Sequence, residues 1–147
     1  MRFELSHVFR GIALPDFITL YYDPEANQAM ARHVKLQREL ISREEKDDVI
    51  TQVVRTAPQR ELPKVMKKAI GSDRIEYVEK TSFDRSTGQG TWRTEPNVLA
   101  GKIVTEGYFS LKQAGENQVQ RVVGGEISVK LPLVGGTIEK LVVNNVE

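Results

Sequence analysis

The chain has 147 residues, of which 39% are hydrophobic and 28% are charged, a balance typical of one globular domain spanning residues 1–147. Its formal net charge of +1 excludes a strong attraction to nucleic acid, and the absence of cysteine excludes disulfides, thiol catalysis and cysteine metal sites. The first residues alternate between apolar and polar types, unlike a signal peptide, and no apolar run reaches membrane-spanning length. We therefore expect a cytoplasmic protein.

The N-terminal segment predicts one strand followed by two short helices. Residues 3–9 alternate, which places four side chains on one strand face: Phe3, Leu5, His7 and Phe9. Helical spacing of apolar residues then predicts a helix pair within residues 14–32. Asp23 can cap the second of these helices, and Pro24 suits its first position, so the boundary is expected here.

Period-two alternation from Val34 to about residue 130 predicts a series of antiparallel strands. Polar turn residues at 46–48, 84–88 and 114–117 predict the hairpins that join them. The last two strands are expected at about 102–112 and 118–130. Gly124 and Gly125 in the last strand predict a bulge or a sharp bend.

Residues 131–136, with the sequence Leu-Pro-Leu-Val-Gly-Gly, predict the start of a last amphipathic helix. Its apolar stripe consists of Val134, Ile138, Leu141, Val142 and Val146. The stripe still continues at Glu147 without a capping residue. The helix is therefore either short or cut at the end of the sequence.

The predicted element order, with one strand, two helices, many strands and a final helix, is the helix-grip order. Residues 17–25, with their Asp-Pro, are similar to the helix-to-helix junction of START-like (SRPBCC) proteins, and residues 132–140 resemble the start of their C-terminal helix. The whole chain resembles a bacterial START-like family of unknown function. Residues 62–64 and 77–81, with Asp84 and Thr87, more weakly resemble PRELI-like phospholipid-transfer proteins. The resemblance implies an α+β fold with a curved antiparallel sheet around a C-terminal helix, and a cavity for a hydrophobic or amphipathic ligand.

Most catalytic signatures are missing from the chain, including zinc-protease, nucleophile-elbow and phosphate-loop motifs. The two histidines, His7 and His33, fall on different predicted elements, so no metal site, no cofactor and no catalytic residue is predicted. His7 shares the apolar face of the first strand, so it can point into the cavity, where it is either a hydrogen-bonded wall residue or a catalytic base.

Three charged residues interrupt otherwise apolar strand faces: Arg55, Glu79 and Arg121. A charge on a buried face is costly unless it is paired, so these residues are either internal ion pairs or anchors for a ligand headgroup. The remaining alternative is a register slip that places one of them on the outer face. Tyr77 flanks Glu79, and Trp92 lies on the next strand. Together with His7, these five residues are the predicted ligand contacts.

Residues 62–71 predict a short basic helix with three lysines on one face, Lys64, Lys67 and Lys68. The helix is either a lid on the sheet or a transient contact to an anionic membrane surface. Co-sedimentation with anionic vesicles distinguishes these two roles.

We expect binding or transport of a hydrophobic small molecule or lipid, rather than catalysis. The alternatives are a cyclase- or dehydratase-like enzyme that uses His7 with Glu79 or Arg121, and a protein-interaction module without a cavity. Residues expected to surround the pocket on the concave side are Phe3, Leu5, Phe9, Val53, Tyr77, Val123, Ile127, Ile138 and Leu141.

Overall fold

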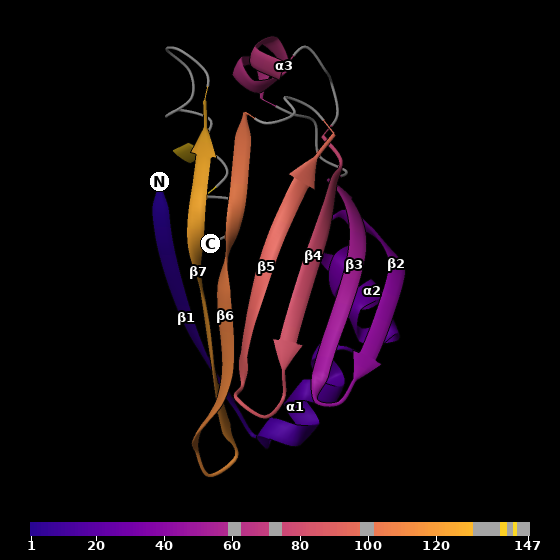
Figure 1. The fold of residues 1–147 in the computed structure, drawn as a ribbon, viewed down its shortest axis with the longest axis vertical. Coiled ribbons are helices and arrows are strands. Elements are labelled where there is room, and N and C mark those ends of the chain that lie inside the picture. Colours follow the sequence, from indigo (N-terminus) through magenta and orange to yellow (C-terminus); the bar gives the residue numbers. More distant parts are fainter. Residues whose placement is uncertain (59–62, 71–74, 98–101, 131–138, 141–142, 144–147) are drawn as a thin grey trace.

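The computed structural model describes residues 1–58, 63–70, 75–97, 102–130, 139–140 and 143. Its main element is a seven-stranded antiparallel sheet in the order β1-β7-β6-β5-β4-β3-β2 (Figure 1). The strands are β1 (Arg2–Arg10), β2 (Leu36–Lys46), β3 (Val49–Pro58), β4 (Tyr77–Asp84), β5 (Gln89–Pro96), β6 (Ile103–Gly115) and β7 (Gln118–Val129). The helices are α1 (Leu14–Tyr21), α2 (Pro24–His33) and α3 (Lys64–Ile70). The predicted α+β class, the antiparallel strands and the two helices after the first strand are confirmed.

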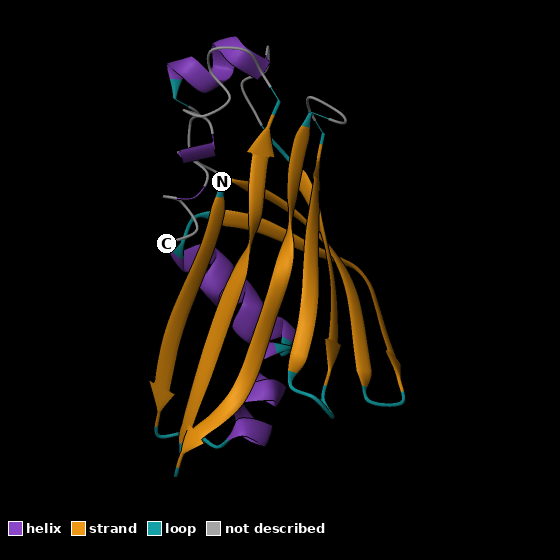
Figure 2. Ribbon diagram, turned by 60° about the vertical axis from the view of Figure 1, so that its left-hand side comes forward, coloured by secondary structure: helices purple, strands orange, loops and turns teal. Residues whose placement is uncertain are grey.

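The two helices cross the sheet because they connect its two edges. β1 pairs with β7 along its whole length, from Arg2 opposite Glu126 to Arg10 opposite Gln118, whereas β2 forms the other edge beside β3. The chain between β1 and β2 must therefore pass over one face. Figure 2 shows α1 and α2 lying on the inner side of the bent sheet. Among the described residues, no helix is long and apolar enough to cross a membrane.

The break between α1 and α2 is fixed by local chemistry. The Asp23 carboxylate accepts a hydrogen bond of 2.8 Å from the backbone N–H of Ala26, and Pro24 occupies the first turn of α2. An aspartate cap satisfies one of the otherwise unpaired N–H groups at a helix start, and proline has no N–H to satisfy. The predicted cap is confirmed.

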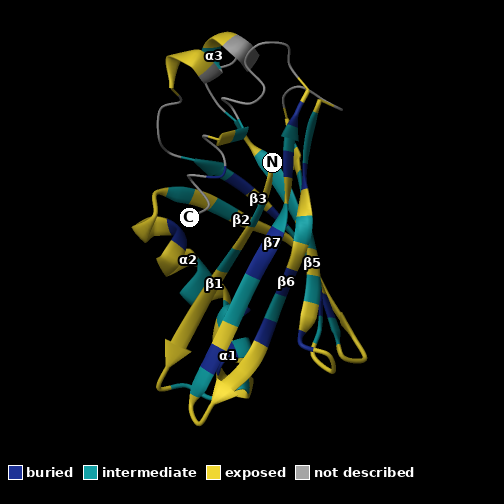
Figure 3. Cartoon of the chain, turned by 90° about the vertical axis from the view of Figure 1, so that its left-hand side faces the viewer, coloured by how far each residue is buried: buried dark blue, intermediate teal, exposed yellow. Residues whose placement is uncertain are grey.

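The core lies where α1 packs on the inner sheet face. Phe83, with no exposed surface, and Ile50, at 1% exposed, pair directly across β4 and β3. The same row of the sheet continues through Gly90 and Phe109 to Val123. Phe17 of α1 and Tyr22, the residue that follows α1, belong to this buried cluster. Figure 3 shows that buried residues concentrate in the strands, while the hairpin tips are exposed.

Glycines allow β6 and β7 to approach closely. A Cβ on Gly107 would lie 2.0 Å from the Gly124 carbonyl oxygen, and one on Gly125 would lie 2.7 Å from the Trp92 ring. The pairing of β7 with both neighbours is continuous through Gly124 and Gly125. Of the two predicted alternatives at these glycines, a bulge or a sharp bend, the bulge is therefore wrong. The register shifts instead occur between Leu40 and Ser42 and between Gln113 and Gly115.

The predicted C-terminal helix falls mainly on residues 131–138, 141–142 and 144–147, outside the described residues, and so do the expected pocket residues Ile138 and Leu141. Glu139, Lys140 and Val143 are described as helical. Glu139 accepts a 2.8 Å hydrogen bond from the backbone N–H of Val129 and lies 3.7 Å from the amino group of Met1. This carboxylate therefore joins the end of β7 to the start of β1.

Candidate functional site

Glu79 is the central polar residue of the inner sheet face. On β4 it lies between Val54 of β3 and Thr94 of β5, and its side chain is half-buried. Burial raises the pKa of the Glu79 carboxyl, and the Arg38 and Arg121 guanidinium groups oppose that rise. A partly buried carboxylate with two arginines near enough to lower its pKa is an unusual feature of a small domain.

Arg38 approaches this carboxyl from β2, at the edge of the sheet. It pairs across the sheet with Thr56, a buried inner-face residue, and is itself half-buried. Its guanidinium donates a 3.4 Å hydrogen bond to the side-chain oxygen of Asn27, and its carbonyl accepts one of 2.8 Å from Gln28. Two residues of α2 therefore fix the position of Arg38.

Arg121 approaches from β7 and is also half-buried. Its Nε donates a 3.3 Å hydrogen bond to the Tyr21 hydroxyl, and its guanidinium carbon lies 5.8 Å from the centre of the Tyr21 ring. That ring stacks on Phe17 and Phe109 at centroid distances of 5.8 and 6.4 Å. The cation is thus supported by an aromatic surface, an arrangement that stabilises arginine.

We call Arg38, Glu79 and Arg121 the inner-face cluster. Both guanidinium groups are near enough to influence the Glu79 carboxyl, yet among the described residues neither forms an ion pair with it or with any other carboxylate. Both cations therefore act on the Glu79 carboxyl from a distance, without a salt-bridge contact. A small polar group that enters between them can accept hydrogen bonds from the guanidinium groups.

Aromatic and hydroxyl side chains surround the inner-face cluster. Burial raises the pKa of the Tyr77 hydroxyl, as does the nearby Glu79 carboxylate, while Arg38 and the Thr56 hydroxyl oppose the rise. Thr56 is only 2% exposed, and within the described part of the chain its hydroxyl oxygen has no hydrogen-bond partner of normal geometry. Trp92 donates a 3.2 Å hydrogen bond to the Gly124 carbonyl and lies against Phe3 at a centroid distance of 6.0 Å.

The predicted contact residues separate into two groups. Tyr77, Glu79, Trp92 and Arg121 lie on the inner face, as expected from the register. His7 also belongs to that face and pairs with Arg121, but it is exposed on the edge strand, four positions from β4 in the sheet order. The convergence of His7 with Glu79 that acid–base catalysis requires is not seen.

Arg55 and Val53 correct the strand assignment of β3. Val53 pairs with Lys80, and Arg55 lies 3.4 Å from Glu39 with its side chain 51% exposed, so both belong to the outer face. The inner face instead carries Val54, which is 7% exposed. Residues 49–54 contain apolar side chains at both alternating positions, so the pattern did not determine the face, and a shift of one residue reverses every side chain.

Arg38 was missed as a site residue. It alternates with Leu36 and Leu40, both apolar, which is the same signal that drew attention to Glu79 and Arg121. The signal was present, but an edge strand that ends in Arg-Glu-Glu-Lys is too polar overall to suggest an inner face.

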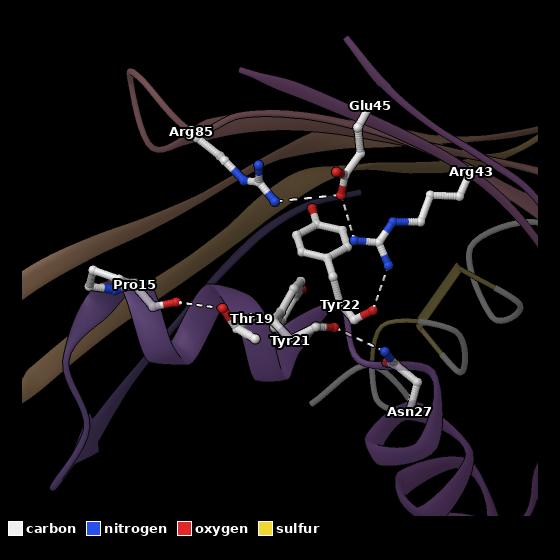
Figure 4. A network of polar contacts seen from close by, with 8 residues as sticks. All are labelled: Pro15, Thr19, Tyr21, Tyr22, Asn27, Arg43, Glu45 and Arg85. Atoms are coloured by element: carbon white, nitrogen blue, oxygen red, sulfur yellow. Dashed lines mark hydrogen bonds and ion pairs between the residues drawn. The ribbon is translucent and has the colours of Figure 1, made fainter. Parts of the chain in front are cut away.

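A second polar network holds the end of α1 against two hairpins (Figure 4). Arg43 donates to the Tyr22 carbonyl at 2.9 Å and to the Glu45 carboxylate at 2.6 Å, and Arg85 reaches the same carboxylate at 3.5 Å. The Arg43 guanidinium also lies over the Tyr22 ring, 5.6 Å from its centre. Asn27 donates to the Tyr21 carbonyl at 3.0 Å. These contacts position Tyr21, and through it Arg121.

Two other regions lie outside the inner-face cluster. A shallow groove of about 540 Å³ lies on the outer sheet face, and its lining includes the charged residues Lys80, Arg93 and Glu106. α3 lies beyond one end of the sheet in Figure 1, with Lys64 and Lys68 exposed and Lys67 half-buried. Membrane contact by these three lysines stays a prediction. No group of three potential metal ligands occurs among the described residues.

Replacing Glu79 with glutamine should increase stability at about pH 8 and have little effect at about pH 4. Because burial raises the folded-state pKa of this carboxyl, its favourable contribution at low pH is lost as the pH rises through that value. Urea denaturation across this pH range measures the difference. Glu106→Gln, on the exposed outer face, is the control. An unchanged pH profile in Glu79→Gln would show that the carboxyl is well solvated.

A family described as a protein of unknown function, DUF2505, matches residues 7–147. The chain belongs to the DUF2505 family. A search of curated proteins finds no match to this DUF2505 chain.

Solved structures similar to the DUF2505 chain have a START-like fold. TTHA0849 from Thermus thermophilus superposes with a TM-score of 0.67 at 14% identity, covering 99% of this chain and 86% of that one. The Zhui aromatase/cyclase from a Streptomyces species gives 0.64 at 12% identity, covering 99% and 87%. A START superfamily protein from Mycobacterium smegmatis gives 0.54 at 12% identity, covering 97% and 88%. The START-like resemblance of the sequence is confirmed, and at these identities it shows the fold alone.

Proposed function

We propose that the protein binds a hydrophobic or amphipathic small molecule on the inner face of its sheet. The observation that carries this proposal is the inner-face cluster itself, in which two half-buried arginines influence the Glu79 carboxyl without an ion-pair contact, beside aromatic residues. A mainly apolar surface with a few convergent polar groups is the usual composition of a small-molecule site.

The fold supports the same proposal. START-like sheets curve around a C-terminal helix, and we propose that the segment from about residue 131 completes this arrangement here. Val143, described as helical and only 8% exposed, is consistent with a helix packed on the sheet. Of the similar structures, one is a START superfamily protein and another an aromatase/cyclase, so the fold by itself does not decide between binding and catalysis.

Binding without catalysis is the better supported of these roles. A cyclase- or dehydratase-like reaction needs an acid and a base within hydrogen-bond reach of the same substrate. His7, the candidate partner for Glu79, is exposed on the edge strand β1, four positions from β4 in the sheet order. We therefore place Glu79 and the two arginines in a recognition role.

The single tryptophan provides a direct test. Trp92 is the only tryptophan in the chain and lies on the inner face, so a ligand entering beside the inner-face cluster should shift its fluorescence. We expect saturable changes with medium-chain amphiphiles at roughly micromolar concentrations, equivalent to about 8 kcal/mol of binding free energy. Trp92→Phe with an environment-sensitive dye serves as the control. Failure of every apolar probe to bind would favour the interaction-module alternative.

A further inference from the structure

The cationic residues of this protein differ in whether a carboxylate lies within ion-pair distance of them. Arg43, Arg55, Arg85 and Lys80 each lie within 4.0 Å of a glutamate, at 2.6, 3.4, 3.5 and 3.2 Å. Three of these side chains are also largely exposed, between 43% and 52%. Arg38 and Arg121 are half-buried on the inner face, and within the described residues no carboxylate reaches either of them.

Stability alone does not favour leaving Arg38 and Arg121 without a contacting carboxylate. An exposed cation needs no partner because water solvates it, whereas a cation withdrawn from water is costly without an anion. The known contacts of Arg38 and Arg121 are neutral, namely the side-chain oxygen of Asn27 and the hydroxyl and ring of Tyr21. Each contact uses only one of the five guanidinium N–H groups. Donors remain available on both residues.

Charge determines which kind of acceptor these donors can bind. In the inner-face cluster, two arginines and one glutamate leave at least one excess positive charge, because both guanidinium groups stay protonated whatever the state of Glu79. A single negative charge neutralises that excess, while a doubly charged group faces added repulsion from the Glu79 carboxylate. Carboxylate oxygens also match the planar geometry of guanidinium. The aromatic residues Trp92, Phe3 and Tyr77 on the same face suit an apolar body attached to the charged end.

We propose that the ligand is an apolar molecule with one carboxylate, and that Arg38 and Arg121 together bind this carboxylate beside Glu79. This inference rests on the proposed function and specifies its ligand class. Arg38 and Arg121 each donate to the carboxylate, while Asn27 and Tyr21 orient the two guanidinium groups. Thr56, whose buried hydroxyl has no hydrogen-bond partner of normal geometry among the described residues, lies in the register position next to Arg38 and can add a hydrogen bond.

The test compares three probes of equal chain length, decanoate, 1-decanol and decyl phosphate, each followed through Trp92 fluorescence near neutral pH. Decanoate is expected to bind about tenfold or more tighter than 1-decanol, since hydrogen bonds to a charged group contribute more than neutral ones. Equal affinity for decanoate and 1-decanol would overturn the inference while leaving the proposed function intact. Tighter binding of decyl phosphate than of decanoate would overturn the assignment of a carboxylate. If none of the three probes binds, both proposals fail.

Substitutions at the two arginines test which residues produce the preference for decanoate over 1-decanol. Arg38→Met and Arg121→Met should each weaken decanoate binding by about tenfold and change 1-decanol binding by less than about twofold. Arg55→Met is the matched control, because Arg55 lies on the outer face with Glu39, and it should bind both probes like the wild type. Tyr21→Phe keeps the ring under Arg121 and removes its hydroxyl, so a smaller loss confined to decanoate is expected. A decanoate preference that survives loss of both arginines contradicts the proposal. Comparison of the three probes on the wild type decides the ligand class even if a variant fails to fold.

Discussion

Replacing Gly107 with alanine is expected to lower the free energy of unfolding by about 3 kcal/mol or more, the upper part of the range for overpacking. The new Cβ would lie 2.0 Å from the Gly124 carbonyl oxygen and 2.6 Å from the Gly125 Cα. Both are backbone atoms of the neighbouring strand, so no side-chain rotation relieves the clash. β6 and β7 would have to separate, and Trp92, which packs over Gly125 and bonds to the Gly124 carbonyl, would move with them.

Gly115→Ala on the same strand is the matched control for this prediction. Its Cβ would meet only the Gln118 side chain, at 3.5 Å, which is an ordinary contact. Urea denaturation of the two variants should therefore give a large loss for Gly107→Ala and a change within about 1 kcal/mol for Gly115→Ala. Similar stability of both variants would mean that β6 and β7 are not as close as described.

Replacing Phe83 with alanine should cost about 3–5 kcal/mol, as expected when a fully buried aromatic side chain is removed from a core. Phe83 has no exposed surface and stacks on Phe109 at a centroid distance of 5.5 Å and against Tyr22 at 6.0 Å. It therefore joins the sheet to the end of α1. Loss of this contact should also loosen Tyr21 and reduce the effect of decanoate on Trp92 fluorescence.

Phe9→Ala provides the comparison for Phe83→Ala. Phe9 is also an inner-face phenylalanine, but it is 39% exposed, and its described ring contacts are with Phe17 and His7. Its removal should cost clearly less, because less apolar surface returns to water. If Phe83→Ala and Phe9→Ala lose equal stability in chemical denaturation, the packing centre lies elsewhere in the domain.

Both predictions bear on the proposed site, because the core and the site share one sheet face. α1 covers the part of the inner face around Phe83, and the same helix carries Tyr21 to Arg121. The network of Arg43, Glu45 and Arg85 fixes the end of that helix. A variant that disturbs the core should therefore also alter ligand recognition, whereas Arg38→Met and Arg121→Met should affect recognition with little change in packing.

Local chemistry was sufficient to predict most of the elements. The Asp23 cap, the proline at the start of α2 and the turn residues between strands act over a few positions, so the sequence alone places the helices and hairpins close to where they occur. The order of these elements also identified the START-like fold, because the succession of strand and helix periods is visible without knowledge of any contact.

The faces of the strands were less certain wherever both alternating positions are apolar. In β3 the sequence was compatible with either face, and burial against Phe83 and α1 selected the one that carries Ile50 and Val54. Arg55 was consequently assigned to the wrong side. In β4 the alternation of Tyr77, Glu79 and Thr81 was compatible with only one face. The structure places Glu79 on that inner face, opposite Val54.

The sequence by itself determined the fold class, the helix boundaries and the presence of charged residues on apolar strand faces. Only the tertiary structure decided which of these charges influence one another. Arg38, Glu79 and Arg121 come from β2, β4 and β7, which lie at positions seven, five and two of the sheet order. Their approach depends on the bend of the sheet, and on α1 and α2, whose Tyr21 and Asn27 hold the two guanidinium groups. Such contacts join residues far apart in the chain, so no local pattern of side chains encodes them.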